Sequence, residues 1–181
     1  MLKPGHHKLL IIGGITGLVF GIGIAGLLFF QRDAKTDFAP TSSLKQREVA
    51  PTFTLALLDG GNFASGEHKG KPVLLNFFAS WCLPCRDEMP AIEKVSREYR
   101  PKDVAFIGVA VDDTEAKLRD FTGKFGVTFP VGLDQGAAIQ KSFGLYGVPT
   151  TYFIDRKGVI SYFHSGAVTE ELLRHELDKL L

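Results

Sequence analysis

The chain has 181 residues, a formal net charge of +1 and 45% hydrophobic residues. This balance excludes a disordered polyampholyte and a nucleic-acid-binding protein with a broad basic face. Two cysteines are too few for the multi-disulfide framework of a small secreted scaffold, so the length fits one compact domain with an appendage.

The appendage begins with residues 1–8, which we expect to be cytoplasmic, and continues with an uncharged run at 9–30. These 22 residues would extend about 33 Å as a helix, which is the thickness of the hydrocarbon core of a bilayer. A cleavable signal peptide is the alternative, but its apolar region usually has only about 7 to 15 residues. No small-x-small cleavage site and no lipid-accepting cysteine follows the run. The sequence therefore predicts an uncleaved transmembrane signal anchor.

The charges beside this span indicate its orientation. Lys3 and Lys8 precede it without any acidic residue, whereas the basic residues that follow are offset by Asp33 and Asp37. The positive-inside rule then places the N-terminus in the cytoplasm and the rest of the chain outside. For a bacterial source, we expect a single-pass protein of the cytoplasmic (inner) membrane, with a flexible tether at 31–50 and a periplasmic domain at 51–181.

Apolar runs alternate with helical patterns through residues 51–181. Strands are predicted within 52–63, 72–80, 103–113, 127–134, 150–155 and 159–166, the last two forming a hairpin. Helices are predicted at 82–100, through Leu118, Phe121 and Phe125, at 136–144, and from an N-cap at Thr169. This order predicts an α/β fold with a central mixed β-sheet flanked by helices on both faces.

Both cysteines of the chain, Cys82 and Cys85, lie in the segment FASWCLPCRDEMP. A disulfide that closes so short a loop contributes only about 2 kcal/mol, against about 4.7 kcal/mol for a 100-residue loop, which argues against a structural staple. A zinc site needs four ligands, and the histidines are scattered. Cu(I) binding by both thiolates remains open because soft sulfur suits that ion.

Redox chemistry explains the surroundings of the pair better. A buried strand delivers Cys82 to the first turn of a helix, where unpaired N–H groups and the helix dipole stabilise a thiolate. Cys82 would then be the attacking nucleophile. Cys85, one turn further and shielded, would resolve the mixed disulfide that Cys82 forms with a substrate.

The segment NFFASWCLPCRDEMP together with GVPTTYFIDRKG resembles the membrane-anchored, thioredoxin-like reductases of the TlpA/ResA/DsbE (CcmG) group. The resemblance covers residue 51 to the C-terminus and implies a thioredoxin-like fold with thiol:disulfide oxidoreductase activity. It implies no cofactor or metal beyond the redox-active pair Cys82 and Cys85. The implied partners are oxidised client proteins, such as apocytochrome c during cytochrome c maturation, and a membrane electron donor of DsbD/CcdA type.

The resemblance also assigns three substrate-binding positions. Trp81 would shield one side of the nucleophile, although a plain core aromatic is the alternative. Pro149 matches the proline that follows a cis peptide bond and faces the two sulfurs. Val148 would present its backbone to an extended substrate segment, as in strand addition.

One departure concerns the acid of the site. Thioredoxin has a buried aspartate six residues before its first cysteine, whereas this chain has Asn76. Glu88 matches a glutamate that the TlpA/ResA-like proteins place near the active site. A half-buried carboxyl there would have a raised pKa and could accept the proton of Cys85. Asp87 and Glu93 are interpreted as solvated helix positions.

The direction of electron flow stays open at this point. A disulfide-forming oxidase of DsbA type would use the same two sulfurs in the opposite direction. A tethered Cu(I) metallochaperone is the alternative outside enzymology.

Overall fold

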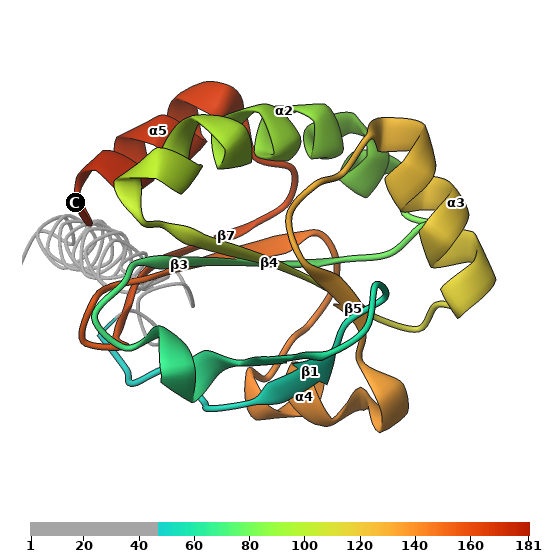
Figure 1. The fold of residues 1–181 in the computed structure, drawn as a ribbon, viewed down its shortest axis with the longest axis horizontal. Helices are drawn as coiled ribbons and strands as arrows, with labels where there is room; N and C mark the ends of the chain where they lie inside the picture. The colour runs from blue at the N-terminus through green and yellow to red at the C-terminus, as the bar shows by residue number, and fades with distance from the viewer. Residues whose placement is uncertain (1–46) are drawn as a thin grey trace, which may run out of the picture. The chain divides into compact units, whose positions relative to one another are not determined.

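The computed structural model describes residues 47–181 (Figure 1). The predicted cytoplasmic residues 1–8, the span at 9–30 and most of the tether at 31–50 lie outside this part of the chain. Among residues 47–181, no helix has both the length and the apolar character needed to cross a bilayer.

A five-stranded sheet forms the centre of the described domain. Its order is β5-β4-β3-β6-β7, with β3 parallel to β4 and antiparallel to β6. The strands are β3 (Val73–Phe78), β4 (Ala105–Ala110), β5 (Val131–Leu133), β6 (Thr150–Ile154) and β7 (Ile160–Ser165). The predicted mixed sheet and its C-terminal hairpin are therefore confirmed.

The central strand β3 is buried along its whole length, which explains its continuous apolar run. Both faces of the sheet are covered, so neither set of alternating side chains reaches water. Asn76 is the one polar residue of this strand and is fully buried. A buried amide at the centre of an apolar strand needs hydrogen-bond partners, and these lie in the active site.

Helices cover both faces of the sheet, as predicted (Figure 1). One face carries α2 (Leu83–Tyr99), α3 (Glu115–Phe125) and α5 (Glu170–Asp178). The opposite face carries α4 (Ala138–Ser142) and the hairpin of β1 (Thr54–Ala56) and β2 (Asn62–Ala64). Short 3-10 helices occupy Ser65–His68, Arg100–Lys102 and Gln135–Ala137. Thr169 caps α5 as predicted, because its side chain accepts a hydrogen bond from the Leu172 amide.

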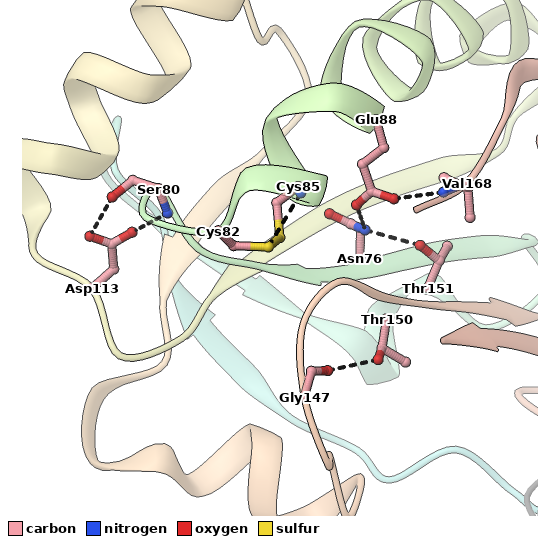
Figure 2. Close-up of a disulfide and its surroundings, with 10 residues drawn as sticks. All are labelled: Asn76, Ser80, Cys82, Cys85, Glu88, Asp113, Gly147, Thr150, Thr151 and Val168. Carbon is pink, nitrogen blue, oxygen red and sulfur yellow. Dashed lines mark hydrogen bonds between the residues drawn. A yellow bond between two sulfur atoms is a disulfide. The ribbon is translucent and has the colours of Figure 1, made fainter. Parts of the chain in front are cut away.

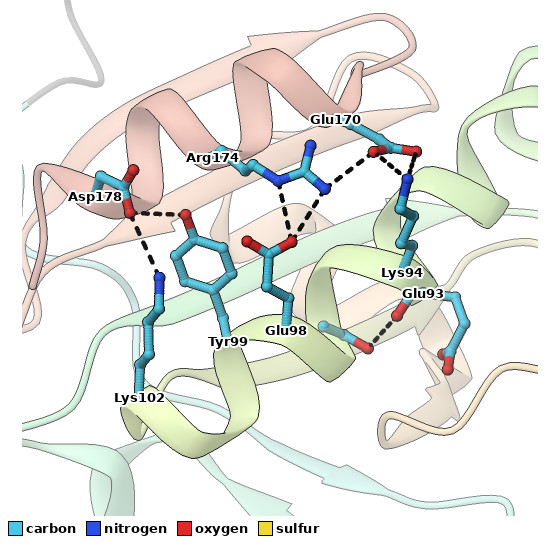
Figure 3. A network of polar contacts seen from close by, with 9 residues as sticks. Glu93, Lys94, Glu98, Tyr99, Lys102, Glu170, Arg174 and Asp178 are labelled. Atoms are coloured by element: carbon cyan, nitrogen blue, oxygen red, sulfur yellow. Dashed lines mark hydrogen bonds and ion pairs between the residues drawn. The ribbon is translucent and has the colours of Figure 1, made fainter.

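Helix α2 is fixed against α5 by polar contacts above a shared apolar core (Figure 3). Arg174 contacts Glu98 and Glu170, each at 3.0 Å, and Tyr99 donates to Asp178 at 2.7 Å. Exposed ion pairs contribute little stability individually, so the buried side chains between the two helices contribute most of the stability of this contact. Helix α2 is thereby held against α5, and the two cysteines lie at its N-terminal end.

The first described residues form part of the folded domain. Arg47 donates its amide to the Ile160 carbonyl at 2.7 Å, and Ile160 donates to Glu48 at 2.9 Å. Ala50 donates to the Gly158 carbonyl at 2.8 Å. Residues 47–50 are thus paired with the turn and the first strand residue of the β6–β7 hairpin. They were predicted to belong to the flexible tether.

Candidate active site

Cys82 and Cys85 are joined by a disulfide at the start of α2 (Figure 2). Cys82 is the N-cap residue of the helix, and its sulfur accepts a hydrogen bond from the Cys85 amide at 3.3 Å. Cys82 keeps 5% of its surface exposed, whereas Cys85 is fully buried. The two cysteines therefore differ in accessibility, which is what the predicted roles, Cys82 as the attacking sulfur and Cys85 as the resolving one, require.

The position of Cys82 provides a chemical reason for that assignment. The first N–H groups of a helix have no partner within the helix, and a sulfur at the N-cap position can accept from them. After reduction, a negative charge on Cys82 would meet these donors and the positive end of the helix dipole. Pro84 stands in the first turn, where the helix does not need its missing N–H.

The loop that leads into Cys82 is held by the residues that follow β4. The Asp113 carboxylate accepts from the Ser80 amide at 2.6 Å and from the Ser80 hydroxyl at 2.9 Å. The Trp81 indole donates to the Asp112 carbonyl at 3.0 Å. Sequence reasoning missed this support, although an acidic pair directly after a buried strand was a usable signal.

Glu88 lies one turn beyond Cys85 in a cluster of neutral polar groups (Figure 2). Its carboxylate accepts from the Asn76 side chain at 2.9 Å and from the Val168 amide at 2.9 Å. Asn76 also donates to the Thr151 hydroxyl at 3.0 Å. The cluster therefore joins α2, β3, β6 and the segment before α5 around one buried carboxyl.

Burial raises the pKa of Glu88 to about 7, although the hydrogen bonds from Val168 and Asn76 act in the opposite direction. The side chain was expected to be half buried, but only 1% of the residue is exposed. Desolvation dominates because neither hydrogen-bond donor carries a positive charge. A carboxyl with this pKa can both hold and release a proton near neutral pH.

The loop before β6 provides the remaining predicted site residues. The peptide bond between Val148 and Pro149 is cis, as the resemblance implied. Pro149 is buried and Val148 is half buried. Because Thr150 is paired with Phe77, this loop lies at the end of β3 that leads to the cysteines.

A groove of about 620 Å³ runs beside this loop, and Trp81 and Val148 both line it. Trp81 is 54% exposed, so it is not a core aromatic. Leu83 and Tyr146 are also large exposed side chains, at 69% and 95%. Trp81 and Leu83 flank Cys82 in the chain, and exposed apolar side chains beside a reactive pair are suited to contact another protein.

One sequence interpretation is wrong. Asp87 is exposed as expected, but Glu93 is buried, with 5% of its surface accessible. Its carboxylate accepts from the Thr128 amide and hydroxyl, each at 2.8 Å, and from Arg97. Glu93 therefore ties α2 to the segment before β5, a contact that helix periodicity alone does not reveal.

Within residues 47–181 there is no group of three or more histidine, cysteine, aspartate or glutamate side chains arranged to hold a metal ion.

Comparison with known proteins agrees with this geometry. Residues 45–181 match the Redoxin family. The chain is 35% identical over 164 residues to the thioredoxin-like protein YneN of Bacillus subtilis, covering 89% of this chain and 93% of that protein. It is 31% identical over 172 residues to the thiol-disulfide oxidoreductase ResA of Bacillus cereus, covering 95% and 92%.

Solved structures give the same result for the fold. A thiol:disulfide interchange protein from Chlorobium tepidum superposes with a TM-score of 0.69 at 27% identity. The superposition covers 75% of this chain and 97% of that protein. The described domain therefore has a thioredoxin-like fold.

Proposed function

Since the chain belongs to the Redoxin family, within the TlpA/ResA/DsbE group, and is a thiol-disulfide oxidoreductase, we propose that it works as a reductase of protein disulfides outside the cytoplasm. The observation that carries this proposal is the pair at the start of α2, where Cys82 keeps 5% of its surface exposed and Cys85 is fully buried. Attack on a client disulfide requires an accessible sulfur, and resolution of the mixed disulfide requires a second thiol close behind it.

In the reducing direction, the Cys82 thiolate attacks one sulfur of the client disulfide. A mixed disulfide forms, and the first client thiolate leaves and takes up a proton. Cys85 then loses its proton and attacks the Cys82 sulfur, which expels the second client thiolate. The client gains two electrons and two protons, and the Cys82–Cys85 disulfide is formed.

Glu88 is proposed to receive the proton of Cys85 in the resolving step. Glu88 and Cys85 are both buried residues of α2 (Figure 2), and the Glu88 pKa of about 7 allows its carboxylate to accept a proton and later return it. Asn76 occupies the position of the thioredoxin aspartate, but an amide cannot serve as a base. Glu88 is the residue of the cluster whose carboxylate can accept the proton.

The client segment is proposed to bind beside the cis Val148–Pro149 bond. Val148 would offer its backbone to an extended chain, while the exposed Trp81 would cover one side of the attacking sulfur. Both residues line the same groove of about 620 Å³. Apocytochrome c, with its haem-attachment cysteines oxidised, is the proposed client.

The proposed location and electron supply rest on the sequence. The uncharged run at 9–30 and the basic residues before it support a single anchor in the bacterial inner membrane, with the domain on the periplasmic side. A membrane electron donor of DsbD/CcdA type would reduce the pair again after each client.

The reduction potential of the full-length protein, purified in detergent and equilibrated in glutathione or dithiothreitol buffers, tests this proposal. A reductase is expected near the value of thioredoxin, about −270 mV. A value near that of DsbA, about −120 mV, would instead identify a disulfide-forming oxidase. Tight stoichiometric Cu(I) binding without disulfide reduction would identify a metallochaperone.

A further inference from the structure

The side-chain oxygen of Asn76 is buried and unsatisfied. The nitrogen of this amide donates to Glu88 and to Thr151, which fixes the orientation of the group. Its oxygen, Oδ1, has no hydrogen-bond partner among the described residues. Figure 2 shows this oxygen pointing back toward the two sulfurs, while the nitrogen points toward Glu88 and Thr151.

An unsatisfied acceptor at this position has a clear energetic cost. Buried carbonyl oxygens almost always accept a hydrogen bond, because they lose their water on folding. The other residues of β3 are apolar, so the strand itself does not require an amide here. A donor that arises in another state of the protein would satisfy this oxygen.

Reduction of the disulfide creates such a donor. Neither sulfur of the Cys82–Cys85 disulfide carries a hydrogen atom, so neither can donate to Asn76 in the oxidised state. Two electrons and two protons convert the pair into two thiols. One of these protons resides on Cys85, which is fully buried like Asn76.

We propose that Asn76 Oδ1 accepts a hydrogen bond from the Cys85 thiol when the pair is reduced. The inference rests on the thiol-disulfide cycle of the proposed function. It adds that Asn76 influences the ratio of dithiol to disulfide at equilibrium. When Cys85 gives its proton to the base and attacks Cys82, the S–H···O contact is lost and the S–S bond forms. The oxidised state then holds an unsatisfied oxygen, so Asn76 stabilises the dithiol relative to the disulfide.

The redox equilibrium with glutathione tests this effect in the full-length protein. Asn76→Leu removes the oxygen and should shift the equilibrium toward the disulfide by about tenfold. Hydrogen bonds that the variant loses in both redox states cancel from this equilibrium. Repeating the comparison in a Glu88→Gln background excludes an indirect effect through the titration of residue 88.

Thr151→Val is the matched control, because it removes an acceptor of the same amide but leaves Oδ1 in place. It should shift the equilibrium much less than Asn76→Leu. No shift in Asn76→Leu, or an equal shift in Thr151→Val, would overturn the inference. A wild-type pair that fails to exchange with glutathione would instead contradict the proposed function.

Infrared spectroscopy of a Cys82→Ser protein provides a direct readout. The chain has only two cysteines, so Cys85 is then the single thiol and the S–H stretching band belongs to it alone. The band should show a hydrogen-bonded donor and should move to higher frequency when Asn76→Leu is added. A band at the frequency of a free thiol in the Cys82→Ser protein overturns the inference even if the double variant does not fold.

Discussion

Two buried glutamates of α2, Glu88 and Glu93, have different surroundings. Glu93 accepts from the Arg97 guanidinium and from Thr128, so its charge is matched by a cation. Glu88 accepts only from the neutral donors Asn76 and Val168 among the described residues, and burial raises its pKa to about 7. Burial of a carboxyl therefore does not define its role; the charge of its partners does.

The difference follows from helix geometry. Five residues separate the two side chains, which places them about 140° apart around the helix axis. Glu88 faces the strands that end at the disulfide, whereas Glu93 faces the segment before β5. One carboxyl is suited to exchange a proton, and the other fastens a loop to the helix.

The largest expected effect comes from removing the titrating group. Glu88→Gln should slow the resolving step by roughly 10²- to 10⁴-fold, the usual contribution of a general base. The rate should also lose its rise as pH increases through about 7, since glutamine has no carboxylate to form. Single-turnover kinetics of the reduced protein with a disulfide peptide, measured across pH, checks both points.

Glu93→Gln is the matched control for this measurement. It changes the same residue type on the same helix, away from the cysteines, and should leave the rate and its pH profile unchanged. A similar loss in both variants would mean that Glu88 acts through the stability of α2 rather than through its proton.

The second prediction concerns stability and pH. The folded-state pKa of Glu88 lies above its ordinary value of 4.5, so the folded protein binds the proton more tightly than the unfolded chain. This contribution is complete below about pH 4.5 and is lost as pH rises through about 7, a decrease on the order of 3 kcal/mol. Urea unfolding of the wild type and Glu88→Gln at several pH values should show a difference that changes by this amount. A constant difference would contradict the raised pKa.

A smaller effect is expected when Glu93 is changed. Glu93→Gln should lower the free energy of unfolding by about 1 kcal/mol, because the Thr128 contacts lose a charged acceptor. Arg97 is 60% exposed, so its ion pair adds little. Urea unfolding at neutral pH measures the loss. A much greater loss would show that the contact between Glu93 and the segment before β5 stabilises the fold by more than its hydrogen bonds account for.

The smallest effect should come from Asp113, a carboxylate that holds the loop before Cys82. Asp113→Asn replaces charge-assisted hydrogen bonds to Ser80 with weaker ones and should slow disulfide exchange by about fivefold. The rise in rate near pH 7 should remain, because Glu88 is untouched. Loss of that rise would mean that Asp113 also takes part in proton transfer.

Much of the fold could be predicted from local pattern. The continuous apolar runs of β3 and β4 predict buried strands, and the two segments joined by residues 156–158 predict a hairpin; the structure confirms both. The position of Cys82 at the start of a helix could also be predicted, since a polar and amphipathic segment follows a buried strand. These features depend on neighbours in the sequence.

The parts that escaped prediction depend on contacts between distant segments. Thr151 and Val168 reach Glu88 or Asn76 only after β6 and the segment before α5 are in place. The cis bond before Pro149 also does not follow from local pattern, since most X–Pro bonds are trans; only the family resemblance implied it. Glu93 was misread because its partner, Thr128, lies 35 residues away.

The pairing of residues 47–50 with the β6–β7 turn determines where the chain enters the domain. In the sheet register, Ile154 lies beside Val73 at the start of β3, whereas Thr150 lies beside Phe77 near the disulfide. The turn after Ile154 and the disulfide are thus at opposite ends of a strand about 20 Å long. Residues 47–50 therefore lie at the end of β3 remote from the sulfurs and do not obstruct the approach of a partner to Cys82.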